Sequence, residues 1–278
     1  MTIRVVSLVP STTETVISLA PPQAELVGRT RYCVEPQPLV SGVEVVGGTK
    51  DVDVARVVAL EPDLVLANRE ENARSDVESL VAAGLRVDVS FPQTVREGVE
   101  HLAHVARLLG VDATDLVHEA AAAVTRFEER RRSVRPLRAF CPIWMSPLMT
   151  IHGSTYISDV LDLVGCANVF ADRPRRYPLA ADLGLRPPVS APDRDARYPR
   201  VSVDELLARA PEIILLPDEP HPFDEEDAAF FRSLPMPASR EGRVVHVDGK
   251  DLMWFGARTA PGVARLVATL SAFFPAVA

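Results

Sequence analysis

The residues best suited to binding chemistry are aromatic side chains in short segments between hydrophobic runs. Aromatic residues make up only 6% of the 278 residues, so their placement is informative. Seven of them fall in predicted loops or at predicted strand ends: Tyr32, Trp144, Tyr177, Tyr198, Phe223, Trp254 and Phe255. Such rings suit a large, flat, apolar ligand, because stacking buries area at little entropic cost. The alternative is that the two tryptophans pack between domains.

Polar side chains in the same kind of segment can complete such a site. His152 and His221 lie at predicted strand ends or in the loops that follow, where a neutral imidazole can bind a metal centre or a ligand amide. The other polar candidates are three arginines for anionic or amide groups and four residues for ligand amides. These are Arg31, Arg69 and Arg258, and Asn68, Glu70, Asn72 and Glu219.

Patterns typical of catalysis or of a protein-bound metal are missing from the sequence. There is no Gly-x-Ser-x-Gly elbow and no phosphate-binding Gly-x4-Gly-Lys-Ser/Thr loop. His101 and His104 are predicted to lie on a solvated helix face, and Asp224 to Asp227 to cap a helix. The three widely spaced cysteines, Cys33, Cys141 and Cys166, fit buried thiols better than a disulfide framework or a zinc site. We therefore predict no catalytic residue and no protein metal site.

Composition limits the class of protein. With 47% hydrophobic and 24% charged residues the chain is typical of a globular protein, and its net charge of −8 disfavours nucleic-acid binding. No apolar run approaches the roughly 18 residues that span a bilayer, so we expect no membrane insertion. The chain as written carries no export signal, which predicts a cytoplasmic protein. If a signal peptide was removed, it is extracytoplasmic.

Strand-like and helix-like segments alternate along the chain. A strand at 3–9 is followed by a helix that Ser11 and Glu14 are expected to begin as a capping box. Helices are then predicted at 53–60, 76–83 and 95–109, and strands at 63–67 and 86–90. This alternation predicts parallel sheets flanked by helices, and the breaker-free run at 113–134 predicts one long connecting helix.

The second half of the sequence repeats the first. VVALEPDLVL at 57–66 is echoed by LLARAPEIIL at 206–215, and GLRVDV at 84–89 by GRVVHV at 242–247. We therefore expect an α/β protein of two similar lobes, 1–111 and 137–278, joined by a backbone helix at 112–136. Small-ligand sites are preferred in a cleft between such lobes. The Pro-, Arg- and Asp-rich segment 172–200 is predicted to be a long, functional loop in the second lobe.

Five motifs, taken in order, resemble a known family. They are SLVPSTTE (7–14), GRTRY (28–32), LEPDLV (60–65), YPRVS (198–202) and WFGART (254–259). The chain resembles the cobalamin-binding, helical-backbone metal receptor group of ABC-transporter substrate-binding proteins, which have the class III periplasmic binding protein fold. The resemblance spans essentially the whole chain. It implies two lobes joined by a rigid helix, little hinge closure, and capture of a corrinoid, haem or iron-siderophore in the cleft.

The resemblance also implies roles for individual residues. Tyr32 matches an aromatic residue that lines the corrinoid site, and Trp144 and Tyr198 fall at or near two others; Asn68 and Thr49 stand where the vitamin B12 binders have aromatic residues. Asp204 matches the acid that docks the second lobe onto transporter arginines. The first-lobe docking position is Ala55, so Asp53 is the nearby substitute.

The sequence therefore predicts a non-catalytic, monomeric receptor, without an intrinsic cofactor, for a corrinoid taken up by an ABC transporter. A ferric siderophore or haem is the alternative ligand. An enzyme or cofactor-handling protein of the cytoplasm on the same scaffold, or a protein-interaction module, is the alternative class.

Overall fold

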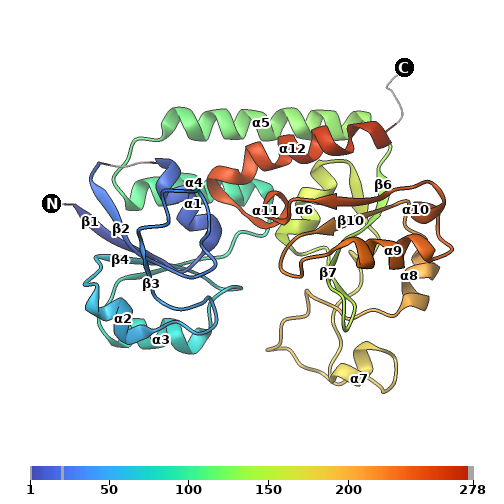
Figure 1. The fold of residues 1–278 in the computed structure, drawn as a ribbon, viewed down its shortest axis with the longest axis horizontal. Coiled ribbons are helices and arrows are strands. Elements are labelled where there is room, and N and C mark those ends of the chain that lie inside the picture. The colour runs from blue at the N-terminus through green and yellow to red at the C-terminus, as the bar shows by residue number, and fades with distance from the viewer. Residues whose placement is uncertain (1, 20–21, 275–278) are drawn as a thin grey trace. The chain divides into compact units, whose positions relative to one another are not determined.

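A computed structural model of the chain describes residues 2–19 and 22–274 and contains two compact units (Figure 1). Unit 1 comprises residues 1–122 and 254–260, and unit 2 comprises residues 123–253 and 261–278. The first boundary falls inside the 20-residue helix α5 (Thr114–Ser133), and the last inside α12 (Thr259–Leu270). The run of strong helix formers is thus one continuous helix, as predicted.

Unit 1 is built on a parallel sheet with the strand order β3-β2-β1-β4-β5. The strands are β1 (Ile3–Ser7), β2 (Ala24–Arg29), β3 (Glu44–Val45), β4 (Leu64–Asn68) and β5 (Val87–Ser90). The helices between them are α1 (Pro10–Leu19), α2 (Val54–Ala59), α3 (Arg74–Ala82) and α4 (Val95–Leu108). Because the strands are parallel, the loops that follow them gather at the carboxyl edge of the sheet, where ligands bind in such folds.

Both faces of the unit 1 sheet are covered. Successive strand side chains point to opposite faces, so Val5 packs in a cluster with α1 and α4, and Val6 packs with α2 and α3. The same alternation places Leu64 and Val65 of β4 in the two clusters. The central strand β4, with the sequence LVLAN, is buried along its whole length, which is typical of a strand in a parallel sheet covered on both faces.

Helix α1 begins differently from the sequence prediction. It starts at Pro10, and the buried Ser11 hydroxyl has no hydrogen-bond partner within the described residues. The Glu14 carboxylate is paired with Arg258 at 2.9 Å instead of turning back to a cap. The capping-box prediction was therefore wrong, because a distant arginine competes for the glutamate. A capping box does form at α4, between Thr94 and Glu97.

Unit 2 contains a second parallel sheet with the strand order β11-β10-β6-β9 and a two-stranded antiparallel hairpin. The sheet strands are β6 (Leu137–Phe140), β9 (Cys166–Asn168), β10 (Ile213–Pro217) and β11 (Val244–Val247), and the hairpin pairs β7 (Pro142–Trp144) with β8 (Met149–Thr150). The remaining helices are α6 (Tyr156–Leu163), α7 (Leu179–Asp182), α8 (Val203–Arg209), α9 (Glu225–Ser233), α10 (Pro237–Arg240) and α11 (Gly249–Met253), with short 3-10 turns η1 (Gly256–Arg258) and η2 (Ser271–Phe273).

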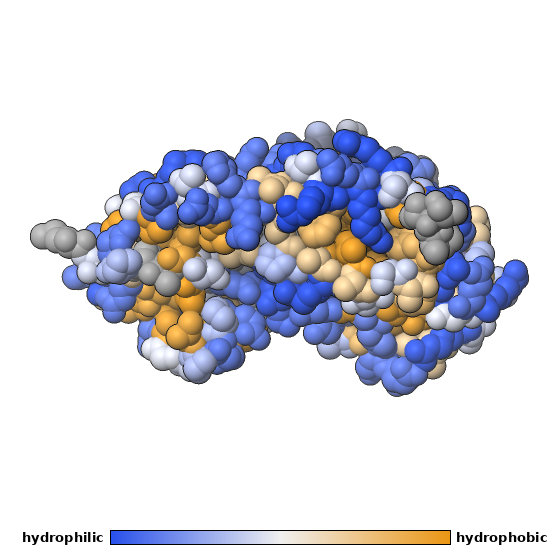
Figure 2. Space-filling model, turned by 90° about the horizontal axis from the view of Figure 1, so that it is seen from above, coloured by the Kyte–Doolittle hydropathy of each residue, from blue (hydrophilic) through white to orange (hydrophobic). Residues whose placement is uncertain are grey.

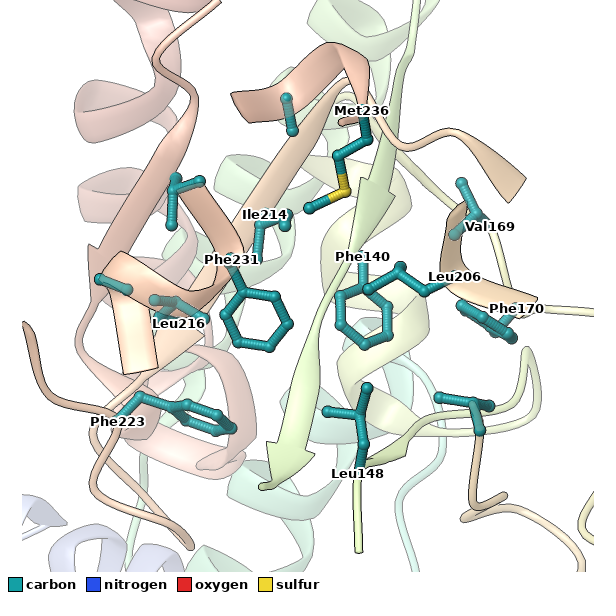
Figure 3. Packing of buried hydrophobic residues seen from close by; sticks show 14 residues of the cluster. Phe140, Leu148, Val169, Phe170, Leu206, Ile214, Leu216, Phe223, Phe231 and Met236 are labelled. Carbon is teal, nitrogen blue, oxygen red and sulfur yellow. The ribbon is translucent and has the colours of Figure 1, made fainter. Parts of the chain in front are cut away.

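Phenylalanines dominate one core of unit 2 (Figure 3). Phe140 of β6 lies between Phe170 and Phe231, with ring centroids 5.5 and 6.0 Å away. Phe223, from the loop after β10, packs against Phe231 at 6.5 Å. The three cysteines are free and buried, as predicted, and burial raises the pKa of Cys141 and Cys166 to about 12.

The two units repeat one topology, and the sequence echoes fall on equivalent elements. Strands β2, β1, β4 and β5 of unit 1 correspond in order to β9, β6, β10 and β11 of unit 2. At the junctions α2–β4 and α8–β10, Glu61 (φ 45°) and Ala210 (φ 46°) adopt the same left-handed conformation. They are the two non-glycine residues with positive φ within the described part of the chain.

The hydrogen bonds at these junctions are also repeated. The carboxylate of Asp63 accepts from the backbone N–H of Arg4 in β1 (2.8 Å), and Glu212 accepts from Arg138 in β6 (3.0 Å). The two arginine side chains then donate to the last carbonyl groups before the left-handed residues, those of Leu60 and Arg209. The observed architecture confirms the predicted fold class, including its duplicated sheets and long helix.

Candidate functional site

In unit 1 the loop after β2 presents an exposed aromatic ring. Tyr32 is 54% exposed, and the guanidinium carbon of Arg31 lies 5.4 Å from its ring centroid. Arg31 also forms an ion pair with Asp51, which holds the arginine beside the ring. This loop can offer a flat apolar surface with a positive group at its side.

The loop after β4 is organised by a buried amide. Asn68 accepts the backbone N–H of Glu70 (2.7 Å) and donates to the hydroxyl of Ser90 (3.3 Å). Asn72 is also buried, and its amide donates to two backbone carbonyls. These two amides shape the loop through these contacts. Arg69 is exposed and lies 5.0 Å from the Phe91 ring, a residue that sequence analysis missed.

The WFGART segment folds into unit 1 instead of presenting its rings. Trp254 is 6% exposed and Phe255 is similarly buried. The guanidinium of Arg258 lies 5.3 Å from the Trp254 ring. Gly256 has φ +86°, and a Cβ there would lie 2.2 Å from the Thr15 hydroxyl, so only glycine fits the turn. Both rings lie in a loop between α11 and η1, as predicted, but they are buried there and are not presented to solvent.

His101 of α4 is part of the same packing. Its ring meets Phe255 edge-on at 4.9 Å, and Nε2 lies 3.2 Å from the Thr12 hydroxyl. Burial lowers the pKa of His101 to about 4, with a smaller contribution from the neighbouring His104. His101 is therefore neutral at pH 7, and its predicted place on a solvated face was wrong. His104 is half-exposed and lies 2.9 Å from Asp88.

In unit 2 a group of rings surrounds the loops after β7 and β10. Trp144, at the end of β7, is 43% exposed, and its indole N–H donates to the Ser146 carbonyl (3.0 Å). His221 lies 5.6 Å from Trp144 and 4.5 Å from Phe223, measured between ring centroids. Phe223 is buried in the phenylalanine core, and the His221 ring packs against it. Trp144 is the ring that remains accessible.

A carboxylate orients His221. Its Nε2 lies 3.0 Å from Asp227 Oδ2. When Nε2 carries the proton, Nδ1 offers a lone pair to a ligand donor or a metal. Asp224 and Asp227 form a capping box at the start of α9, which confirms the capping role predicted for this acidic run. Sequence analysis missed the contact of Asp227 with His221, because a capping role already explained the acid.

His152 and Tyr198 are tied to one another through the backbone. The N–H of His152 donates to the Arg197 carbonyl (2.7 Å), and Nδ1 of His152 accepts from the Ser154 backbone (3.1 Å). Tyr198 is half-buried, with the Arg197 guanidinium 5.5 Å from its ring centroid. Glu219 is half-buried in the loop after β10 and packs against Gly249. None of these contacts prevents a role in ligand binding.

The two predicted docking acids occupy different positions. Asp53 is the N-cap of α2 and accepts the Arg56 N–H at 3.0 Å. Ser202 caps the equivalent helix α8, and Asp204 lies exposed in its first turn. By the equivalence of the two helices, Ala55 and not Asp53 corresponds to Asp204. Among the described residues no group of three or more His, Cys, Asp or Glu side chains could hold a metal ion.

Comparison with known proteins decides the family. The model of the periplasmic binding protein family matches residues 5–250. The chain belongs to this family. The match begins within β1 and ends within α11, so it includes both parallel sheets except the start of β1, and it confirms the resemblance found in the sequence.

Relatives of this periplasmic binding protein include named receptors. It is 28% identical to the vitamin B12-binding protein of Photorhabdus laumondii subsp. laumondii over 220 residues, which are 77% of this chain and 70% of that protein. It is also 28% identical to the vitamin B12-binding protein of Yersinia pestis (strain Pestoides F) over 238 residues, 84% of this chain and 76% of the relative.

Solved structures share its fold. A periplasmic haem-binding protein from Pseudomonas aeruginosa superposes with a TM-score of 0.76 at 21% identity, covering 100% of this chain and 95% of the other. The periplasmic vitamin B12-binding protein of Vibrio cholerae gives 0.72 at 20% identity, covering 97% and 96%. This periplasmic binding protein is thus a binding protein and not an enzyme. No helix within the described residues is long and apolar enough to cross a bilayer, and the face in Figure 2 carries many hydrophilic side chains.

Proposed function

We propose that this periplasmic binding protein captures a corrinoid, cobalamin, for an ABC-type uptake system. The observation that carries the proposal is the exposure of two large rings, Tyr32 and Trp144, in loops at strand ends, in a chain related to vitamin B12-binding proteins. Exposed aromatic rings in ligand loops provide binding surface at low entropic cost. The corrinoid is the transported ligand and not an intrinsic cofactor.

Each unit by itself offers candidate ligand contacts. In unit 1, Tyr32 stacks on the ligand, and Arg31 and Arg69 meet its polar groups. In unit 2, Trp144 stacks, and His221 accepts a hydrogen bond from a corrin amide through Nδ1. Tyr198, His152 and Glu219 are further contacts on the same unit, and Glu70 on unit 1. Arg258, paired with Glu14, has the weaker case.

Haem is the second candidate, and His221 is the observation that favours it. A metal-binding histidine typically donates its other ring N–H to a carboxylate, which is the relation of His221 to Asp227. With Nε2 held in this way, Nδ1 is available as an axial ligand to iron. In a ferric siderophore the iron is already enclosed by the siderophore's own oxygen ligands. Such an iron needs no histidine ligand from the protein.

Calorimetric titration of the ligand-free protein separates these ligands. Hydroxocobalamin, haem and a ferric hydroxamate siderophore are titrated in turn. Saturable one-to-one binding of hydroxocobalamin alone is the expected result. Saturable binding of haem alone, with a shift of its Soret absorption that His221→Ala abolishes, would replace cobalamin by haem. Heat with none of the three would end the metal-chelate proposal.

The ring of Trp144 gives a sharper test of the same proposal. Trp144→Ala should weaken hydroxocobalamin binding about tenfold or more while leaving the melting temperature unchanged, because the ring is accessible. Leu185→Ala removes an even more exposed apolar side chain of the same unit and should leave the affinity unchanged. Equal affinities of wild type and Trp144→Ala would remove Trp144 from the site.

Transporter docking is assigned to Asp204. Asp204→Lys should leave the calorimetric affinity unchanged but lower uptake of labelled cobalamin by cells, because only the surface that meets the transporter has changed. Asp53→Ser keeps the cap of α2 and provides the matched test of the other acid. Full uptake by the Asp204→Lys variant would contradict the docking role.

A further inference from the structure

Residues 172–200 of unit 2, here called the insertion, are basic in an acidic chain. They contain seven arginines and four aspartates, a net charge of +3, whereas the whole chain carries −8. The motif Asp-Arg-x-x-Arg-Tyr-Pro occurs twice, beginning at Asp172 and at Asp193. The proposed function assigns a role to Tyr198 of the insertion and none to its arginines.

A buried ion pair holds the insertion in place. Arg173 is 4% exposed, and its Nη1 lies 3.0 Å from Asp182 Oδ1 while Nε lies 2.9 Å from Glu205. Asp182 also accepts the backbone N–H groups of Arg176 (2.9 Å) and Arg200 (2.7 Å). The carboxylate of Asp182 is therefore fully used inside the protein. It anchors the insertion but leaves little charge for other arginines.

Two further arginines gather on one tyrosine. The guanidinium carbons of Arg175 and Arg194 lie 5.1 and 5.0 Å from the centroid of the Tyr177 ring. The Tyr177 hydroxyl donates to the Asp195 carbonyl at 2.8 Å, which fixes the ring. The Asp195 carboxylate itself is engaged by Arg197 at 2.6 and 2.9 Å. Tyr177 thus holds two cations near each other without neutralising them.

Arg200 joins this group from the other end of the insertion. The Nε atoms of Arg175 and Arg200 are buried and have no hydrogen-bond acceptor within the described residues. Their outer nitrogens make no hydrogen bond or ion pair with any residue that the structure describes, and they are not sealed from solvent. Burial, followed by the positive charge of Arg175, lowers the pKa of Arg200. The Asp182 carboxylate accepts the backbone N–H groups of both Arg176 and Arg200, so Arg175 and Arg200 come from segments that lie side by side, with the donors of their side chains unused.

We propose that Arg175 and Arg200, with Arg194 beside them, bind a carboxylate or phosphate group of the transported ligand. The planar fork of arginine matches both oxyanions, and one anion between two guanidinium groups removes their mutual repulsion. This inference rests on the proposed function, and it assigns the ligand class as a metal chelate that carries an oxyanion.

The backbone places this oxyanion site beside the candidate ligand loops of the same unit. Residues 197–200 run along β8, with hydrogen bonds from Thr150 N–H to the Pro199 carbonyl (3.0 Å) and from His152 N–H to the Arg197 carbonyl (2.7 Å). The β7–β8 hairpin also carries Trp144. A ligand stacked on Trp144 therefore lies next to the segment that contributes Arg200.

Matched pairs of ligands test the site. Hydroxocobalamin carries a phosphate and cobinamide lacks it; haem carries two carboxylates and its dimethyl ester has none. Within the pair that the wild type binds, calorimetry should show an affinity about tenfold higher for the member that carries the oxyanion. The variant Arg175→Gln/Arg200→Gln should lose this preference. Cobinamide also lacks the ribose and the base, so a preference for hydroxocobalamin over cobinamide identifies phosphate when the double variant loses it. A preference for haem over its ester identifies carboxylate.

Arg186→Gln is the matched control, because Arg186 is an exposed arginine of the same insertion and should keep the preference. If the wild type binds both members of a pair equally, or the double variant retains the preference, the oxyanion site is wrong while the proposed function stands. Citrate and inorganic phosphate provide an independent arm. If no chelate binds but either anion raises the melting temperature of the wild type and not of the double variant, the oxyanion site stands and the proposed function fails. Absence of both effects overturns the site.

Discussion

Units 1 and 2 share a framework but use the same connection differently. This connection runs from β2 to α2 in unit 1 and from β9 to α8 in unit 2. In unit 1 this connection, residues 30–53, adds the edge strand β3 and carries two basic and four acidic residues. In unit 2 the connection contains the insertion, with seven basic and four acidic residues and no strand of the sheet.

The comparison separates the residues that stabilise the fold from the residues that are expected to bind the ligand. The repeated junctions have Glu61 and Ala210 in the same conformation and the same hydrogen bond from an arginine N–H to Asp63 or Glu212, and they serve the sheets. The segments after the strands are free of that requirement and have diverged. Ligand chemistry is therefore expected where the units differ, at Tyr32 in unit 1 and at Trp144 and the arginines in unit 2.

The largest expected effect tests whether the insertion is a fixed part of unit 2. Asp182→Ala removes one of the two carboxylates that pair with the buried Arg173, leaving Glu205, and also removes two backbone contacts. Breaking such a pair costs about 3–5 kcal/mol in the free energy of unfolding. Chemical denaturation of the wild type and the variant measures this change in the free energy of unfolding. Asp172→Ala, whose carboxylate is exposed and paired with Arg209, should change the free energy of unfolding by less than about 1 kcal/mol. Equal effects would show that the insertion is not anchored.

The two tryptophans test the difference between buried and accessible rings. Trp254→Ala should lower the free energy of unfolding by about 3–4 kcal/mol, because the ring is buried in unit 1. Trp144→Ala should leave that free energy nearly unchanged and affect ligand affinity instead. Thermal and denaturant unfolding of both variants would decide the matter, and a stable Trp254→Ala protein would contradict the burial.

A pH titration tests the packing that is peculiar to unit 1. His101 has a pKa of about 4 in the folded protein and an ordinary value of 6.5 in the unfolded chain. Stability is fully present above pH 6.5 and is lost as the pH falls towards 4, because the unfolded state then binds a proton that the folded state excludes. The loss amounts to ~3 kcal/mol.

His101→Gln removes the titrating group, so the free energy of unfolding of this variant should fall less between pH 6.5 and 4 than that of the wild type. His118→Gln replaces a histidine of α5 for which no such burial exists, and it provides the control. Parallel pH profiles for wild type and His101→Gln would mean that the imidazole is not sealed from water.

The smallest expected effect tests the equivalence of the two junctions. Glu61→Gly and Ala210→Gly relieve a left-handed conformation, and each should raise the free energy of unfolding by about 1 kcal/mol. Ala208→Gly, in the exposed part of α8, should lower it by about as much. Opposite signs for Glu61→Gly and Ala210→Gly would break the comparison between the units.

Much of the fold was predictable from local patterns. The strands and helices at 53–109, the long helix and the repeat around Pro62 and Pro211 were found in the sequence, because apolar periodicity and proline placement act over a few residues. The candidate site was only partly predictable. Loop positions identified Tyr32 and Trp144, but they also suggested Trp254, Phe255 and Phe223, which are buried.

The sequence by itself determined the elements, their order and the duplication, since these depend on neighbours along the chain. Only the tertiary structure decided which rings face solvent and which charges are paired. Residues 254–258 meet Glu14, Thr15 and His101, far away in the chain, and the two ends of the insertion lie together only because Asp182 binds the backbone of both Arg176 and Arg200. Burial and charge depend on such long-range neighbours, so composition and spacing could not reveal them.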